Sequence, residues 1–116
     1  MNEFLIAIHR DLKSKDASPS PEQMQASIKP FQDWIGGIAA QNKLVSPPTR
    51  WDIDGRVVTS DRMVINGPYA EIKESLGGLF IVRANDYEEA VEMAKGCPIL
   101  PWGAAVEVRM AMPSPQ

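Results

Sequence analysis

The hydrophobic positions of the chain fall into two repeats of a strand, a helix and a second strand. Residues 4–9 and residues 79–84 are short apolar runs in which hydrophobic side chains alternate onto both faces of a strand. A strand that is apolar on both faces is typical of the centre of a sheet covered on both sides. Residues 104–111 alternate apolar with more polar positions, which predicts a half-buried strand.

A long helix is predicted after the first strand. Ser20 has the properties of an N-cap, with Pro21 at the first helical position and Gln23 placed to reach back to the cap. Apolar residues then recur at intervals of three and four, which indicates one buried stripe: Met24, Ile28, Phe31, Ile35 and Ile38. Pro30 predicts a kink or break near residues 26–29.

Gly36-Gly37 lies in the same helix. We interpret the pair as a place where the helix packs closely against the sheet, with a functional hinge as the alternative.

A second helix is predicted to begin at Asp86, with Glu89 completing a capping box. Gly96 is expected to end it in a left-handed conformation. The pattern places one set of residues in the core (Tyr87, Ala90, Val91, Ala94) and another in water (Glu88, Glu89, Glu92).

Two short strands are expected between the repeats. Residues 51–58 resemble a hairpin that turns on Asp54-Gly55, and residues 63–65 form a further strand. Asn66-Gly67-Pro68 then requires a sharp turn.

This order of elements predicts an α+β fold. With right-handed crossovers, βαββαβ gives a ferredoxin-like, four-stranded antiparallel sheet with both helices on one face, in a single domain spanning residues 1–116. The other face then carries Leu5 and Ala7 with apolar residues of 79–82, a large patch for a monomer. We therefore predict that a second copy covers it, giving a homodimer.

Composition narrows the classes of function. The chain has 12 basic and 15 acidic residues, a net charge of −3, and no basic cluster, which disfavours direct binding of nucleic acid or a membrane surface. Its first apolar run is too short for a signal peptide or a membrane span. The single cysteine, Cys97, excludes an internal disulfide and a cysteine-based metal cluster. We expect a cytoplasmic protein without a metal or other cofactor.

Several segments together resemble the DGPF-type branch of the YCII-related family. They are residues 66–74 (NGPYAEIKE), Gly77-Gly78 with the strand that follows, residues 90–98, residues 106–109 (VEVR), and residues 34–41 and 43–45. The resemblance covers nearly the whole chain. It implies a dimeric α+β barrel built of ferredoxin-like halves, and it implies no settled activity.

The chain departs from the family pattern at three places. Some YCII-type relatives have a proposed site with a His in the first helix and an Asp before a Pro after the second. Here the first helix has no His, Cys97 precedes Pro98, and Asn66 replaces the Asp of the DGPF motif. A His-Asp mechanism of that type is therefore not expected.

The remaining candidates for a site are few. His9 and Glu107 are weak catalytic candidates, and their simpler interpretations are a hydrogen-bonding His at a strand end and an ion pair of Glu107 with Arg109. Cys97 is interpreted as a buried, inert thiol. Polar residues near the predicted turns and the last strand are candidates for ligand binding: Asn66, Tyr69, Glu71, Lys73 and Arg109.

Two functions remain open. The first is a dimeric barrel that binds a small molecule in a pocket between the sheet and the helices, with enzyme-like proton transfer that uses His9, Lys73 or Glu107. The second is a non-catalytic regulatory or interaction module, for which the family resemblance suggests a connection with transcription initiation. Convergent titratable groups in a cleft favour the first function, and a barrel filled with apolar side chains favours the second.

Overall fold

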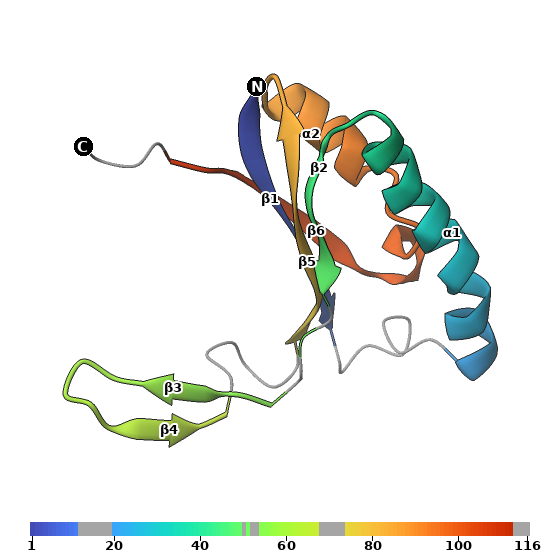
Figure 1. Ribbon diagram of the computed structural model, residues 1–116. Helices are drawn as coiled ribbons and strands as arrows, with labels where there is room; N and C mark the ends of the chain where they lie inside the picture. The colour runs from blue at the N-terminus through green and yellow to red at the C-terminus, as the bar shows by residue number, and fades with distance from the viewer. Residues whose placement is uncertain (12–19, 50, 52–53, 68–73, 113–116) are drawn as a thin grey trace.

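Two strand-helix-strand units build the chain, with a small hairpin inserted between them (Figure 1). The computed structural model describes residues 1–11, 20–49, 51, 54–67 and 74–112. Its elements are, in order, β1 (Asn2–Asp11), α1 (Pro21–Ala40), β2 (Leu44–Thr49), β3 (Arg56–Val58), β4 (Val64–Asn66), β5 (Glu74–Ala84), α2 (Tyr87–Ala94), the 3-10 turn η1 (Leu100–Trp102) and β6 (Ala105–Met110).

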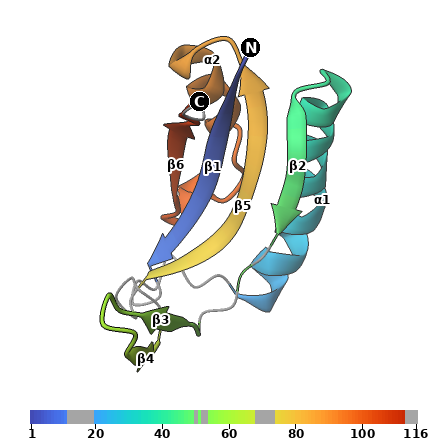
Figure 2. The same ribbon diagram turned by 60° about the vertical axis from the view of Figure 1, so that its left-hand side comes forward.

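The main sheet has the strand order β2-β5-β1-β6, and every pair is antiparallel. As predicted, the two strands that are apolar on both faces, β1 and β5, are central. Both helices cover the same face of the sheet, as Figure 1 shows edge-on, and Figure 2 shows the strands side by side. The predicted α+β fold with a four-stranded antiparallel sheet is confirmed. Pairing into a dimer stays a prediction.

The core lies between the helices and one face of the sheet. Phe4, Ile6, Phe80 and Val82 point into it and are at most 1% exposed. The Trp34 ring of α1 meets Phe80 edge to face, with ring centroids 5.4 Å apart. The Trp34 indole Nε1 also donates to the Met93 carbonyl oxygen, 2.8 Å away, so this side chain joins α1, the sheet and α2.

Helix α1 begins as the sequence predicts. The Ser20 hydroxyl accepts from the Gln23 backbone N–H, and the Gln23 side chain accepts from the Ser20 N–H, which completes the capping box. The break expected near residues 26–29 is wrong, because the helix continues through Pro30 to Ala40. Ala26 is exposed, so water can satisfy the carbonyl that Pro30 leaves without a partner.

The interpretation of Gly36-Gly37 as a close-packing site is also wrong. Both residues are exposed, and a Cβ built on either meets no atom within 4 Å.

Helix α2 differs from its prediction on the solvent side. Asp86 caps the Glu89 N–H at 2.9 Å, but the Glu89 carboxylate bonds Asn85 (3.0 Å) and Lys43 (2.7 Å) instead of closing a capping box or facing water. The hydrogen bond from Lys43 is the main cause that lowers the pKa of Glu89. The pair ties the start of α2 to the exit of α1.

The other face of α2 and its end also need correction. Ala90 and Ala94 are buried as expected, whereas Tyr87 and Val91 are 45% and 37% exposed. The Tyr87 ring still meets the core residue Phe4 edge to face, with ring centroids 5.1 Å apart. Gly96 has no positive φ. It is required for another reason, since a Cβ there would lie 2.8 Å from the Trp34 ring.

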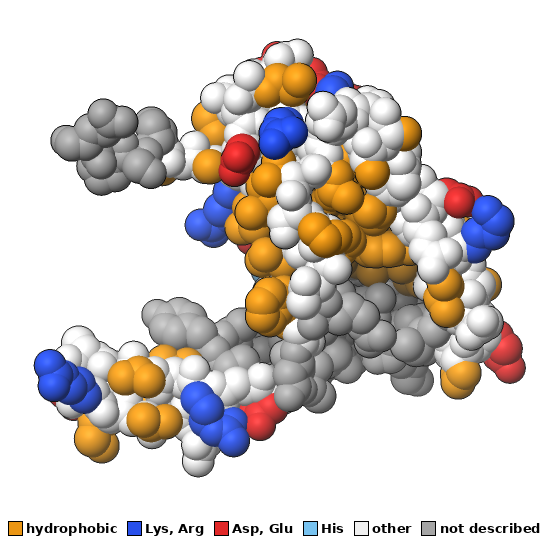
Figure 3. Space-filling model, in the orientation of Figure 1, with side chains coloured by type: hydrophobic (Ala, Val, Ile, Leu, Met, Phe, Trp, Pro, Cys, Tyr) orange, Lys and Arg blue, Asp and Glu red, His pale blue; other side chains and the backbone are white. Residues whose placement is uncertain are grey.

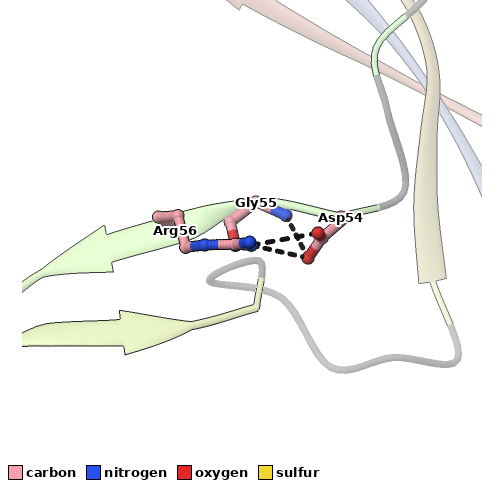
Figure 4. Close-up of polar contacts among 3 residues, drawn as sticks. All are labelled: Asp54, Gly55 and Arg56. Atoms are coloured by element: carbon pink, nitrogen blue, oxygen red, sulfur yellow. Dashed lines mark hydrogen bonds and ion pairs between the residues drawn. The ribbon is translucent and has the colours of Figure 1, made fainter.

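The inserted hairpin pairs β3 with β4, in the register Arg56 to Asn66 and Val58 to Val64. Its turn lies between Thr59 and Met63, so the predicted turn at Asp54-Gly55 is wrong. Asp54 instead accepts from the Gly55 N–H at 2.8 Å and from Arg56 at 3.0 Å, at the base of the hairpin (Figure 4). Among the described residues, no helix is long and apolar enough to cross a membrane.

Candidate functional site

The face of the sheet opposite the helices carries the side chains that are the best candidates for a functional site. Register places Leu5 opposite Ile81 and Ala7 opposite Leu79, so the middle of this face is apolar. We call it the bare face, and define it by Leu5, Ala7, His9, Leu79, Ile81, Glu107 and Arg109. In Figure 1 it looks away from both helices.

His9 and Glu107 meet on the bare face, so the prediction that they line a pocket between the sheet and the helices is wrong. In the β1–β6 register His9 lies opposite Ala105 and Ala7 opposite Glu107, which makes His9 and Glu107 diagonal neighbours. His9 Nε2 lies 2.9 Å from Glu107 Oε1, and the two side chains are 30% and 35% exposed. The structure therefore brings together the two weak catalytic candidates, whose positions are 98 residues apart in the chain.

Arg109 extends this pair. Its Nε donates to Glu107 Oε2, as two residues on the same side of one strand permit. The hydrogen bond from Arg109, followed by the one with His9, holds the pKa of Glu107 below its ordinary value. Glu107 is thus ionised at neutral pH, and its carboxylate acts as an acceptor.

A hollow of about 270 Å³ adjoins Arg109 on this side of the molecule. Leu5 and Ile81 form its apolar floor, and Glu3 and Arg109 supply charged groups at its rim; Phe4, Met110 and Ala111 complete the lining. Apolar walls with a small number of polar groups are typical of sites for small molecules.

The other sequence candidates do not join this cluster. Asn66 is the last residue of β4, in the separate two-stranded sheet, and is exposed. Tyr69, Glu71 and Lys73 lie outside the described residues. Cys97 is buried against Ile8 and Ile99, as its interpretation as a core thiol predicts. Among the described residues, no group of His, Cys, Asp and Glu side chains could hold a metal ion.

Sequence reasoning did not find the hollow beside Arg109. The alternation of β6 does place Glu107 and Arg109 on one face, and this signal was available. The pairing of β6 with β1, which brings Leu5 opposite Arg109, depends on register and could not be read from spacing.

Comparison with known proteins shows the family. The model of the YCII-related domain matches residues 11–112, and the chain belongs to this family. The family resemblance is confirmed, while the narrower assignment to the DGPF-type branch stays a prediction. No curated protein matches the chain.

One solved structure with a similar fold is 5-chloro-2-hydroxyhydroquinone dehydrochlorinase (TftG) from Burkholderia phenoliruptrix AC1100, in complex with 2,5-dihydroxybenzoquinone. The two chains are 18% identical. The similarity covers 92% of this chain and 90% of that one, with a TM-score of 0.44.

Proposed function

We propose that this YCII-related protein is a homodimer that binds a compact organic anion on the bare face and transfers a proton to or from it. The observation that carries the proposal is the His9–Glu107 contact of 2.9 Å, with Arg109 joining the pair to the adjoining hollow.

The pair is arranged for proton transfer. An ionised carboxylate that accepts from one imidazole nitrogen fixes the ring and its tautomer, as in hydrolytic triads. An imidazole beside an ionised carboxylate can take up a proton from a bound molecule, and the carboxylate stabilises the imidazolium that results. Partial exposure of both side chains leaves the pair accessible from the bare face.

Arg109 defines the class of ligand. A guanidinium has five N–H donors, and the bond through Nε to Glu107 uses one of them. The others can bind a carboxylate or an enolate oxygen, while Leu5 and Ile81 offer a surface for the apolar part.

A second copy is part of the proposal because the bare face is too open to exclude water. A second copy stacked on the bare face, at the usual spacing of about 10 Å between packed sheets, would exclude water from the space between the two sheets. Exclusion of water strengthens the interactions of His9, Glu107 and Arg109 with a ligand.

The test is a screen of small organic acids by thermal shift, with wild type compared with His9→Asn and Glu107→Gln. Glu92→Gln is the matched control, because Glu92 forms an exposed pair with Lys95 on α2, 2.9 Å long and away from the bare face. Compounds that stabilise wild type are then incubated in D₂O, and deuterium incorporation at carbon is followed by NMR.

The proposal expects stabilisation that His9→Asn weakens and the control keeps, together with deuterium incorporation that both site variants lose. Stabilisation that is equal in all four proteins would place binding elsewhere. If no compound stabilises wild type, the small-molecule function is wrong and the interaction module becomes the better hypothesis.

A further inference from the structure

The hairpin β3–β4 projects from one end of the sheet toward the side of the bare face, away from both helices (Figure 1). The contacts of β3 and β4 are mainly with each other. In Figure 3, hydrophobic side chains are visible on this projection, and a wide open gap separates it from the upper part of the molecule.

Both faces of this hairpin are apolar. Val58 pairs with Val64 on one face, and Val57 with Ile65 on the other. Val58, Val64 and Ile65 are 66%, 61% and 54% exposed, and Met63 in the turn is 62% exposed. An isolated two-stranded hairpin is marginally stable in water, so these side chains need a partner surface.

Hydrogen bonds close the hairpin at both ends. The Thr59 N–H donates to the Met63 carbonyl at 2.8 Å in the turn, and the Gly67 N–H donates to the Gly55 carbonyl at 2.8 Å at the base. Asp54 and Arg56 add an ion pair at the same base (Figure 4). These contacts set the direction in which the apolar side chains of the hairpin are presented.

The exposed surface of the chain favours a second copy as the occupant. Its accessible surface is 8229 Å², roughly 1,900 Å² more than a compact monomer of this mass exposes. A standard interface buries roughly 800 Å² on each partner, so the excess is enough for a stable dimer.

We infer that the hairpin of each protomer packs against the partner and closes the open end of the space over the bare face, so that each site is completed in trans. The inference rests on the dimer of the proposed function. Stacked sheets lie about 10 Å apart, whereas the hairpin from Arg56 to Ser60 extends roughly 16 Å. A hairpin that leaves the sheet on the side of the bare face, which we call the arm, is therefore long enough to reach the partner. In a two-fold dimer the partner's hairpin makes the same contact with this chain, next to its own site.

Paramagnetic labelling across protomers tests the inference. A nitroxide is attached to Ser60→Cys protein of natural isotope abundance, and this protein is refolded together with ¹⁵N-labelled wild type that carries no nitroxide. Cys97 is 3% exposed in the folded protein and stays unmodified when the nitroxide is attached. We expect signals of the labelled protomer to broaden at the bare face, in residues 5–9 and 105–109. A tag at Gln32→Cys, exposed on α1, is the control and should leave those signals sharp.

A pair of substitutions supplies a second measurement. Val58→Ser with Val64→Ser should raise the dimer dissociation constant roughly tenfold or more, since each removes buried apolar surface. Val91→Ser, on α2 and 37% exposed, is the matched control and should leave it unchanged. A wild type that is monomeric by light scattering overturns both the pairing and the arm. A dimer without broadening at the bare face, or unaffected by the hairpin substitutions, overturns the arm alone.

Discussion

The indole of Trp34 leaves no room for a side chain at position 96. A Cβ on Gly96 would lie 2.8 Å from both Trp34 Cδ1 and Nε1, in a ring that is fixed by its hydrogen bond to the Met93 carbonyl. Gly96→Ala should therefore lower the free energy of unfolding by about 1–3 kcal/mol, the usual cost of overpacking. Urea denaturation followed by tryptophan fluorescence measures it.

Gly36→Ala is the matched control. Position 36 lies inside α1 with open space around it, so alanine gains helix propensity without a clash. It should raise the free energy of unfolding by about 0.5–1 kcal/mol. Equal effects of the two substitutions would show that the contact between Gly96 and Trp34 is not a constraint.

Glu107 makes stability depend on pH in a defined direction. Arg109 and then His9 lower its pKa in the folded state from the ordinary 4.5. Its contribution is therefore fully present above pH 4.5 and is lost as the pH falls through the lowered folded value. The difference in unfolding free energy between wild type and Glu107→Gln should be larger at pH 7 than at pH 3.

Chemical denaturation at the two pH values checks this expectation. Glu92→Gln, which removes the exposed pair with Lys95, should give a small difference at both. A difference for Glu107→Gln that grows on acidification would contradict the contacts of the carboxylate.

For single residues, the sequence indicated which side chains could take part in a site more readily than which of them come into contact. The residue types of His9, Glu107 and Arg109 marked them as candidates, but their contact depends on strand register, which spacing does not determine. The alternative interpretation of Glu107 as the partner of Arg109 is also correct, since one carboxylate accepts from both side chains. From the sequence, Glu107 as a catalytic candidate and Glu107 as the partner of Arg109 were alternatives, and in the folded sheet Glu107 contacts both His9 and Arg109.

Among the elements, α1 depends on its first turn. The capping box of Ser20 and Gln23 satisfies two backbone donors at a helix start whose residues are otherwise exposed. Ser20→Ala should lower the free energy of unfolding by about 1 kcal/mol. Ser20→Asp keeps an acceptor and should restore most of it, as measured by denaturation; a rescue that fails would assign the effect to packing.

Elements with strong periodicity or caps were predictable, and the short inserted strands were not. The capping residues of α1 and α2 agree with the sequence because they act locally. The turn of the hairpin lies at residues 59–63 and not at the predicted Asp54-Gly55, because residues 56–58 pair with residues 64–66. Asp54 instead accepts hydrogen bonds from Gly55 and Arg56 at the base of the hairpin. Glu89 does not close the predicted capping box but pairs with Lys43, which lies 46 positions away in the chain and which no local pattern indicates as its partner.

For the whole molecule, the order of elements was enough to predict the sheet and its central strands. Patterning also indicated that one face is apolar and uncovered by helices. It gave no sign that the insert would project as an arm, because the exposure of Val58, Val64 and Ile65 depends on where the hairpin leaves the sheet.

The dimer can be tested at Leu5, which lies on the bare face, half-buried and opposite Ile81. Leu5→Asp would place an unpaired carboxylate between two apolar sheets, where desolvation is costly, and should raise the dimer dissociation constant at least about 100-fold. Light scattering over a range of concentrations measures it. Circular dichroism confirms folding, and Leu5→Ser offers a milder change should the aspartate unfold the chain.

Val91→Asp is the control, since it places the same charge on α2, away from the bare face, at a side chain that is 37% exposed. It should leave a dimer that is built through the bare face intact. If Leu5→Asp and Leu5→Ser both assemble like wild type while Val91→Asp dissociates, the copies pair through the helices. The His9–Glu107 pair would then face open water, and its use for proton transfer in an enclosed space would lose its physical basis.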